Sequence, residues 1–191
     1  MDPPTVRPAH PEDVRLLLQL FGELAEYEHL EHELKATEAQ LGEALFGKRP
    51  AAEALIAERD GEALGYALFF PTFSSFLAST GVWLEDLFVR KEHRGEGVGR
   101  ALLEAVAALV QERGGERLEW AALDWNEPAL GFYRRIGAAT MNEWITHRLD
   151  GAGLTSAATG DAATTGARLA RPRSAGSLPN GPRRSRRSAP S

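Results

Sequence analysis

The sequence contains no cysteine, and this absence excludes several kinds of chemistry. Without a thiol the chain has no disulfide bonds, no zinc site built from thiolates and no acyl-cysteine intermediate. The five histidines are scattered and show no spacing typical of a metal site, so we expect no metal. A chain without disulfides suits a reducing compartment, and we predict a cytoplasmic protein.

Long apolar runs are also missing from the sequence. No stretch approaches the ~20 apolar residues that a helix needs to span a bilayer, and the N-terminus lacks the basic and apolar regions of a signal peptide. We therefore expect no contact with a membrane. With 43% hydrophobic and 26% charged residues, the composition is that of an ordinary globular domain.

Charge is distributed unevenly between two regions. Residues 151–191 contain seven arginines and one acid, Asp161, and subtracting these from the totals of 22 and 27 leaves 15 basic and 26 acidic residues in positions 1–150. The first region thus carries a formal charge of −11 and the second a charge of +6. An acidic body disfavours nucleic acid as a partner and attracts cationic ligands.

The same two regions differ in their capacity to fold. Residues 151–191 consist mainly of Ala, Gly, Ser, Thr, Pro and Arg, with three leucines as the only large apolar residues. The small apolar surface of residues 151–191 cannot offset the conformational entropy that the segment would lose on ordering. We therefore interpret residues 1–150 as one domain and residues 151–191 as a disordered tail.

Strand and helix patterns alternate through residues 1–150. The strongest turn signal is Asp60-Gly61, which predicts a β-hairpin. Pro71 is expected to end or bend the second strand of that hairpin, or to leave it at a sheet edge. The patterns predict strands at Thr5–Pro8, Ala54–Arg59, Glu62–Phe70, Val82–Val89, Leu118–Leu123 and within Met141–Leu149, and helices from Pro11 to Tyr27 or Leu30, from Thr37 to near Gly47, from Val98 to about Gln111 and from Asn126 to Ile136.

A glycine-rich turn between a predicted strand and a predicted helix carries the clearest chemical signal. It reads Arg-x-x-Gly-x-Gly over residues 94–99. The first N–H groups of a helix have no partner within the helix, and glycines let an anion approach them closely. The turn is not a dinucleotide fingerprint, because Arg100 stands in place of the third glycine, and it lacks the lysine of a Walker loop.

A second motif follows one strand later, where residues 126–137 fit the pattern N-x-x-A-x-x-F-Y-x-x-x-G. With both motifs in this order, the chain resembles the GCN5-related N-acetyltransferases (GNAT). In that family the first motif binds the pyrophosphate of coenzyme A and the second lies beside its pantetheine arm. Further segments are similar to the diamine (spermidine/spermine) N-acetyltransferase subgroup over residues 4–149, namely Arg7–Ala9, Glu23–Glu28, Leu84–Asp86 and Trp125–Pro128.

This resemblance implies a fold, a donor and an assembly. We expect the GNAT fold, an α/β (α+β) domain whose mixed, mostly antiparallel sheet has six to seven strands, splayed at the centre, and four flanking helices. We also expect acetyl-CoA as cosubstrate, a homodimer, and a β-bulge near Leu87–Val89 that would admit the pantetheine arm. The residues expected to bind acetyl-CoA are Leu87, Phe88, Val89, Arg94, Gly95, Glu96, Gly97, Val98, Gly99, Arg100, Asn126, Glu127, Pro128, Ala129 and Tyr133.

Acetyl transfer to an amine requires that the ammonium lose a proton and that the departing sulfur gain one. The resemblance places the proton donor at Tyr133, whose phenol is protonated at neutral pH. It places the base at Glu85, acting directly or through water, although an ordinary carboxylate is a weak base and could act mainly by attracting the ammonium. Because side chains alternate along a strand, only one of Glu85 and Asp86 is expected to face the cleft, and the resemblance favours Glu85.

The acceptor is expected to lie among acids and an aromatic ring. We predict contacts from Tyr27, Glu28, Glu85 and Asp124, because carboxylates and an aromatic face suit a molecule with spaced positive charges. The predicted reaction transfers acetyl directly, within a ternary complex, to a primary amine of a small diamine or polyamine. Two alternatives stay open, which are acetylation of a protein lysine or N-terminus, and a non-catalytic acyl-CoA-binding module.

Overall fold

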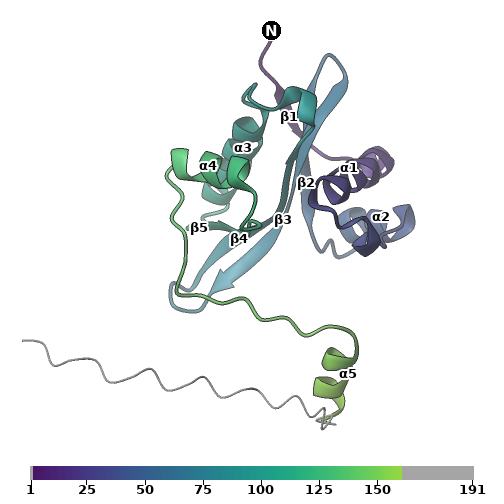
Figure 1. The fold of residues 1–191 in the computed structure, drawn as a ribbon, viewed down its shortest axis with the longest axis vertical. Coiled ribbons are helices and arrows are strands. Elements are labelled where there is room, and N and C mark those ends of the chain that lie inside the picture. The colour runs from purple at the N-terminus through teal and green to yellow at the C-terminus, as the bar shows by residue number, and fades with distance from the viewer. Residues whose placement is uncertain (1, 161–191) are drawn as a thin grey trace, which may run out of the picture. The chain divides into compact units, whose positions relative to one another are not determined.

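The computed structural model describes residues 2–160, and the chain divides into two units, Met1–Ala138 and Ala139–Ser191. The first unit contains the whole sheet and the helices packed on it (Figure 1). The arginine-rich part of the predicted tail, with Asp161, lies outside the described residues.

The sheet of the first unit has five strands in the order β1-β2-β3-β4-β5. The first three neighbouring pairs are antiparallel, and β4 and β5 run parallel. The antiparallel majority and the helical crossover between the last two strands agree with the predicted mixed sheet. The strands are β1 (Thr5–Pro8), β2 (Glu53–Arg59), β3 (Glu62–Ser74), β4 (Ser79–Val89) and β5 (Arg117–Trp120).

The helices begin where the sequence predicts capping residues. Thr37 caps α2, since its hydroxyl accepts a hydrogen bond from the N–H of Gln40, 3.3 Å away. Asn126 caps α4 by accepting from the N–H of Ala129, also at 3.3 Å. The helices of the first unit are α1 (Val14–Glu28, preceded by a 3-10 turn at Pro11–Asp13), α2 (Glu38–Phe46), α3 (Val98–Glu112) and α4 (Glu127–Arg135).

The sheet separates two apolar cores. On one face, Leu17 and Leu20 of α1 pack with residues of α2 and with Ile56 and Tyr66. On the other face, α3 contributes Leu102 and other residues of its apolar stripe, and α4 adds partly buried side chains. Figure 1 shows α1 and α2 on one side of the sheet and α3 and α4 on the other. The sheet is therefore covered by helices on both faces.

The pairing of β3 with β4 contains a bulge that decides the geometry of the site. Phe69 lies opposite Leu84 and Leu68 lies opposite Asp86, so Glu85 is an extra residue without a partner on β3. Leu84 and Phe88, four residues apart, would share a face in a regular strand. They instead pack in the two different cores, on opposite faces of the sheet. The bulge thus turns Asp86 and Phe88 toward the face that α1 covers.

Two sequence predictions need correction, and a third, on Pro71, is confirmed in one of its alternatives. The strand predicted within Met141–Leu149 is absent, and Trp144 and Ile145 in that segment are exposed, so the described sheet has five strands and not six to seven. A strand requires a pairing partner, which apolar alternation alone does not supply. For Pro71 the edge alternative is confirmed, because from Phe70 onward β3 pairs only with β4 and Pro71 stands at an edge. Gly151–Thr159 forms a helix, α5, inside the predicted tail.

Candidate active site

A cavity of about 560 Å³ opens beside the second half of β4. Its walls come from the C-terminal end of α1, the turn between β4 and α3, the first residues of α3, the segment after β5, and α4. Elements from both sides of the sheet therefore meet at one place, which is typical of a binding site.

The cavity exists because β4 and β5 separate. They pair only over Gly81–Leu84 and Arg117–Trp120, so β4 has no partner on that side from Glu85 onward. Leu87–Val89 of β4 and Ala121–Leu123, which follow β5, all line the cavity. The splayed centre of the sheet agrees with the sequence prediction, but the bulge lies at Glu85, earlier than the predicted Leu87–Val89.

The glycine-rich turn forms one end of the cavity. Gly95 and Gly97 have φ angles of 84° and 86°, a region that favours glycine, and a Cβ atom on either would meet nothing within 4 Å. Gly97 directly precedes α3, whose first N–H groups are free of helical partners. This end of the cavity is thus open, positively polarised and sterically accessible, as an anion site requires.

The acid in this turn is kept away from the cavity. Glu96 accepts a hydrogen bond from Arg59 of β2 at 2.8 Å and does not line the cavity, although the sequence analysis placed it among the binding residues. The Arg59 guanidinium, followed by His93, lowers the pKa of Glu96. Glu127 lies outside the lining as well and pairs with Arg134 at 3.2 Å. The other predicted acetyl-CoA contacts all line the cavity.

Tyr27 connects three elements around the opening. Its hydroxyl donates to Oδ1 of Asn126 at 3.1 Å, and the guanidinium of Arg94 lies 4.3 Å from the centre of its ring. Arg94 also donates to the backbone carbonyl of Val89 at 3.0 Å. Tyr27 thereby links the end of α1 to the glycine-rich turn and to the cap of α4.

Tyr133 lines the cavity from α4. Its ring lies 5.0 Å from that of Trp120 and 5.4 Å from that of Phe132, which fixes its direction. Burial, and then the charge of Glu28, raise the pKa of the Tyr133 phenol above its usual value. The phenol is therefore protonated at neutral pH and can donate a proton.

Acidic side chains gather at the other end of the cavity. Glu28, Glu85 and Asp86 all line it, whereas the predicted contact Asp124 does not. The expectation that only one of Glu85 and Asp86 faces the cleft is wrong, because the bulge breaks the alternation between them. Burial raises the pKa of Glu28, and burial, followed by the charges of Glu85 and Glu28, raises the pKa of Asp86.

Sequence reasoning missed several residues of this site. Strand alternation left room for only one of Glu85 and Asp86, and the resemblance favoured Glu85. Nothing in the sequence pattern distinguished Tyr66, whose hydroxyl donates to Asp86 at 3.0 Å, from an ordinary core tyrosine. With Tyr66, all three tyrosines of the chain lie at or next to the cavity. The other missed lining residues are Leu24, His93, Ala121, Ala122, Leu123, Phe132, Arg135 and Ile136.

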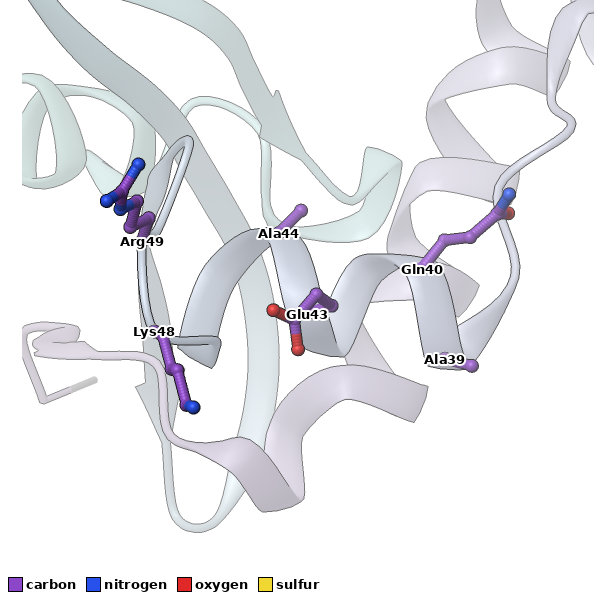
Figure 2. Close-up of a pocket in the computed structure, with 6 residues that line it drawn as sticks. All are labelled: Ala39, Gln40, Glu43, Ala44, Lys48 and Arg49. Atoms are coloured by element: carbon purple, nitrogen blue, oxygen red, sulfur yellow. The ribbon is translucent and has the colours of Figure 1, made fainter.

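A second hollow, of about 670 Å³, lies on α2 and the turn after it. Figure 2 shows its polar side chains, Gln40, Glu43, Lys48 and Arg49, pointing in different directions around the helix. A binding site needs polar groups that converge on one ligand, so this wider hollow is a surface feature despite its size.

Residues 2–160 lack two other features. In that part of the chain, no cluster of three or more histidine, aspartate or glutamate side chains is arranged to hold a metal ion. No helix there has both the length and the apolar character needed to cross a membrane.

Comparison with known proteins agrees with the geometry. The sequence pattern of the Acetyltransferase (GNAT) family matches residues 15–138. The chain belongs to this family. A thialysine N-epsilon-acetyltransferase of Bos taurus is 34% identical over 157 residues, which cover 76% of this chain and 92% of that protein. An L-ornithine N5-acetyltransferase of Arabidopsis thaliana is 31% identical over 194 residues, with coverage of 78% and 85%.

A solved structure supports the same assignment of fold. The Vibrio cholerae integron cassette protein VCH_CASS6 superposes with a TM-score of 0.70 at 26% identity, covering 83% of this chain and 99% of that one. The GNAT fold predicted from the two motifs is thus confirmed, and the protein is an N-acetyltransferase that uses acetyl-CoA. The open glycine turn and the unpaired half of β4 fit a long donor with an anionic end.

Proposed function

We propose that this GNAT enzyme acetylates a primary amine of a small diamine or polyamine, by direct attack of the amine within a ternary complex. The observation that carries the proposal is the convergence of Glu28, Glu85 and Asp86 on one cavity. Three carboxylates beside the ring of Tyr27 suit a small molecule with more than one positive charge. Relatives named for thialysine and ornithine support an acceptor of this size and charge.

The donor end of the cavity would hold acetyl-CoA, which supplies an acetyl group activated as a thioester. The free N–H groups after Gly97, with Arg94 and Arg100, would bind the pyrophosphate. The unpaired backbone of Leu87–Val89 would contact the pantetheine arm, and Asn126, with Pro128 and Ala129, would form the other wall.

The acceptor end would position the amine and manage its protons. Tyr133 would donate a proton toward the departing sulfur, since its phenol stays protonated. Glu85 and Glu28 would attract the ammonium and hold it near the opening between β4 and β5. Glu85 was predicted as the base, and its exposure favours the alternative role of electrostatic capture.

The experiment measures release of free CoA from acetyl-CoA with spermidine, spermine, putrescine, thialysine, ornithine, lysine and a lysine-containing peptide. We expect turnover with at least one small molecule that carries two or more amines. Tyr133→Phe should lower kcat by about 100-fold or more while acetyl-CoA still binds. Phe132→Leu, a neighbouring substitution that spares the phenol, is the matched control for disturbance of α4.

Turnover of the peptide alone would contradict a small acceptor. Acetyl-CoA binding with no release across the whole panel would contradict the proposal in favour of a different acceptor class. Tyr133→Phe with unchanged kcat would remove Tyr133 from the role of acid. The family resemblance also predicts a homodimer, and light scattering on the purified protein tests that assembly.

A further inference from the structure

The bulge in β4 places two neighbouring carboxylates in one cavity, and their surroundings differ. Glu85, the unpaired residue of the bulge, is exposed, and its Oε2 accepts a hydrogen bond from the indole N–H of Trp83 at 2.8 Å. Asp86 is half-buried on the face that α1 covers. Its Oδ2 accepts a hydrogen bond from the hydroxyl of Tyr66 at 3.0 Å.

Tyr66 gives Asp86 a fixed position. Tyr66 is fully buried in β3, and its ring packs against Phe21 at 5.0 Å and Phe88 at 6.0 Å between ring centres. A side chain held on both sides cannot leave without opening the core beneath α1. The hydroxyl of Tyr66 therefore holds one oxygen of Asp86 and leaves the other free to accept from a ligand.

The charges around Asp86 are all of one sign. Glu85 lies beside it on β4 and Glu28 faces it from α1, while Tyr66 on β3 is neutral. Among residues 2–160, no arginine, lysine or histidine forms an ion pair with Asp86. Burial and then the two neighbouring carboxylates raise its pKa to about 6, against the opposing effect of the Tyr66 hydrogen bond. A carboxylate with a raised pKa is a stronger base than an ordinary one.

We propose that Asp86, positioned by Tyr66, is the group that accepts the proton of the substrate ammonium, and that Glu85 only attracts the substrate. This inference rests on the proposed function, since it assumes a small cationic amine in the cavity. Asp86 is then a catalytic residue, and Tyr66 is a positioning residue that acts through it.

The ammonium transfers one proton to the free oxygen of Asp86, which leaves a neutral amine with a lone pair. The amine nitrogen forms a bond to the acetyl carbon, and the bond from that carbon to sulfur breaks. The second proton lost by nitrogen ends on sulfur, with Tyr133 as the donor that is then restored. The proton on Asp86 is released to water, so the products are an amide, a free thiol and one proton.

The test is the pH dependence of kcat/KM for the amine at saturating acetyl-CoA. In the wild type, the rate should fall about tenfold per pH unit below about pH 6, because only ionised Asp86 accepts the proton. Asp86→Asn should lower the plateau by about 100-fold or more and abolish this acid limb. Tyr66→Phe should lower the plateau less than Asp86→Asn does and move the limb to higher pH, because the lost hydrogen bond both positioned Asp86 and stabilised its charged form.

Glu85→Gln is the matched control on the same strand. It should move the limb to lower pH, because the charge that opposes ionisation of Asp86 is removed, and it should raise KM more than it lowers kcat. His93→Gln removes the histidine that lines the cavity, and the acid limb should persist in this variant. An acid limb that persists in Asp86→Asn and disappears in Glu85→Gln would overturn the proposal and return the base to Glu85.

A measurement without turnover keeps the two proposals separate. The ionisation of Asp86 can be followed by carboxyl ¹³C NMR in the full chain, in the wild type and in Tyr66→Phe. A pKa near 4 for Asp86 in the wild type would overturn this inference even if the enzyme acetylates small amines. Absence of turnover with every amine of the panel would instead refute the proposed function. The NMR titration does not depend on turnover, so it would still measure whether the pKa of Asp86 is raised.

Discussion

Asp13 and Asp86 are both partly shielded from bulk water, but their surroundings shift their pKa values in opposite directions. Asp13 lies between β1 and α1, where it accepts two hydrogen bonds from Arg7, at 2.7 and 3.0 Å, and one from the backbone N–H of His10 at 2.8 Å. Asp86 has one neutral donor and two acidic neighbours. Arg7 lowers the pKa of Asp13, whereas burial raises that of Asp86.

The difference separates an acid that holds the fold together from one that is available to a ligand. A carboxylate that is fully satisfied by a guanidinium and a backbone N–H contributes stability and has no capacity left for a substrate. A carboxylate kept without a cation destabilises the folded protein and gains an ion pair only when a cationic ligand arrives. The comparison predicts opposite responses to the same substitution.

Asp13→Asn should have the largest effect on stability. We expect a loss of about 2 kcal/mol in the free energy of unfolding at pH 7, because two charge-assisted hydrogen bonds from Arg7 are lost or weakened. The pKa of Asp13 is lowered in the folded protein, so the wild type loses this contribution as the pH falls through that lowered value. The two proteins should therefore converge in acid. Urea titrations at pH 7 and in acid measure this, and equal stability at pH 7 would contradict it.

Asp86→Asn should have the opposite sign. The pKa of Asp86 is about 6 in the folded protein and about 3.9 in an unfolded chain, which corresponds to a cost of about 3 kcal/mol for the ionised form above pH 6. Because Asp86 is partly exposed to water, which screens its charge, we expect about 2 kcal/mol of this cost in the folded wild type. The variant should be more stable by about that amount at pH 8, and the gain should vanish near pH 4. Urea titrations at the two pH values check the sign. A variant less stable than the wild type at pH 8 would show that Asp86 is satisfied in the fold.

Glu53→Gln should have the smallest effect on stability, because it removes a charge that is paired but not buried. Glu53 pairs with Arg113 at the surface, and both side chains are 43% exposed. An exposed ion pair contributes less than about 1 kcal/mol to the free energy of unfolding, because water and salt screen the attraction. Thermal unfolding at low and high salt should show a small difference that salt removes. A loss as large as that of Asp13→Asn would mean that pairing alone, and not burial, separates Asp13 from Asp86.

The sequence predicted most of the fold from local signals. Thr37 and Asn126 cap the helices that they were expected to cap, and Asp60-Gly61 forms the turn between β2 and β3. These features depend on a few neighbouring residues, so the sequence pattern suffices to locate them. The strand within Met141–Leu149 was predicted wrongly, because a strand depends on a partner elsewhere in the chain.

The sequence by itself determined the family chemistry of this protein. The spacing of Gly95, Gly97 and Gly99 and the position of Tyr133 after Asn126 are local patterns, and they predicted an acetyl-CoA-dependent enzyme that the family match confirms. Only the tertiary structure decided which acids share the cavity. Glu85 and Asp86 face it together because β4 bulges against β3, and Glu96 is turned away because Arg59 of β2 binds it. Register and long-range ion pairs join residues far apart in the chain, so no local pattern of residue types can specify them.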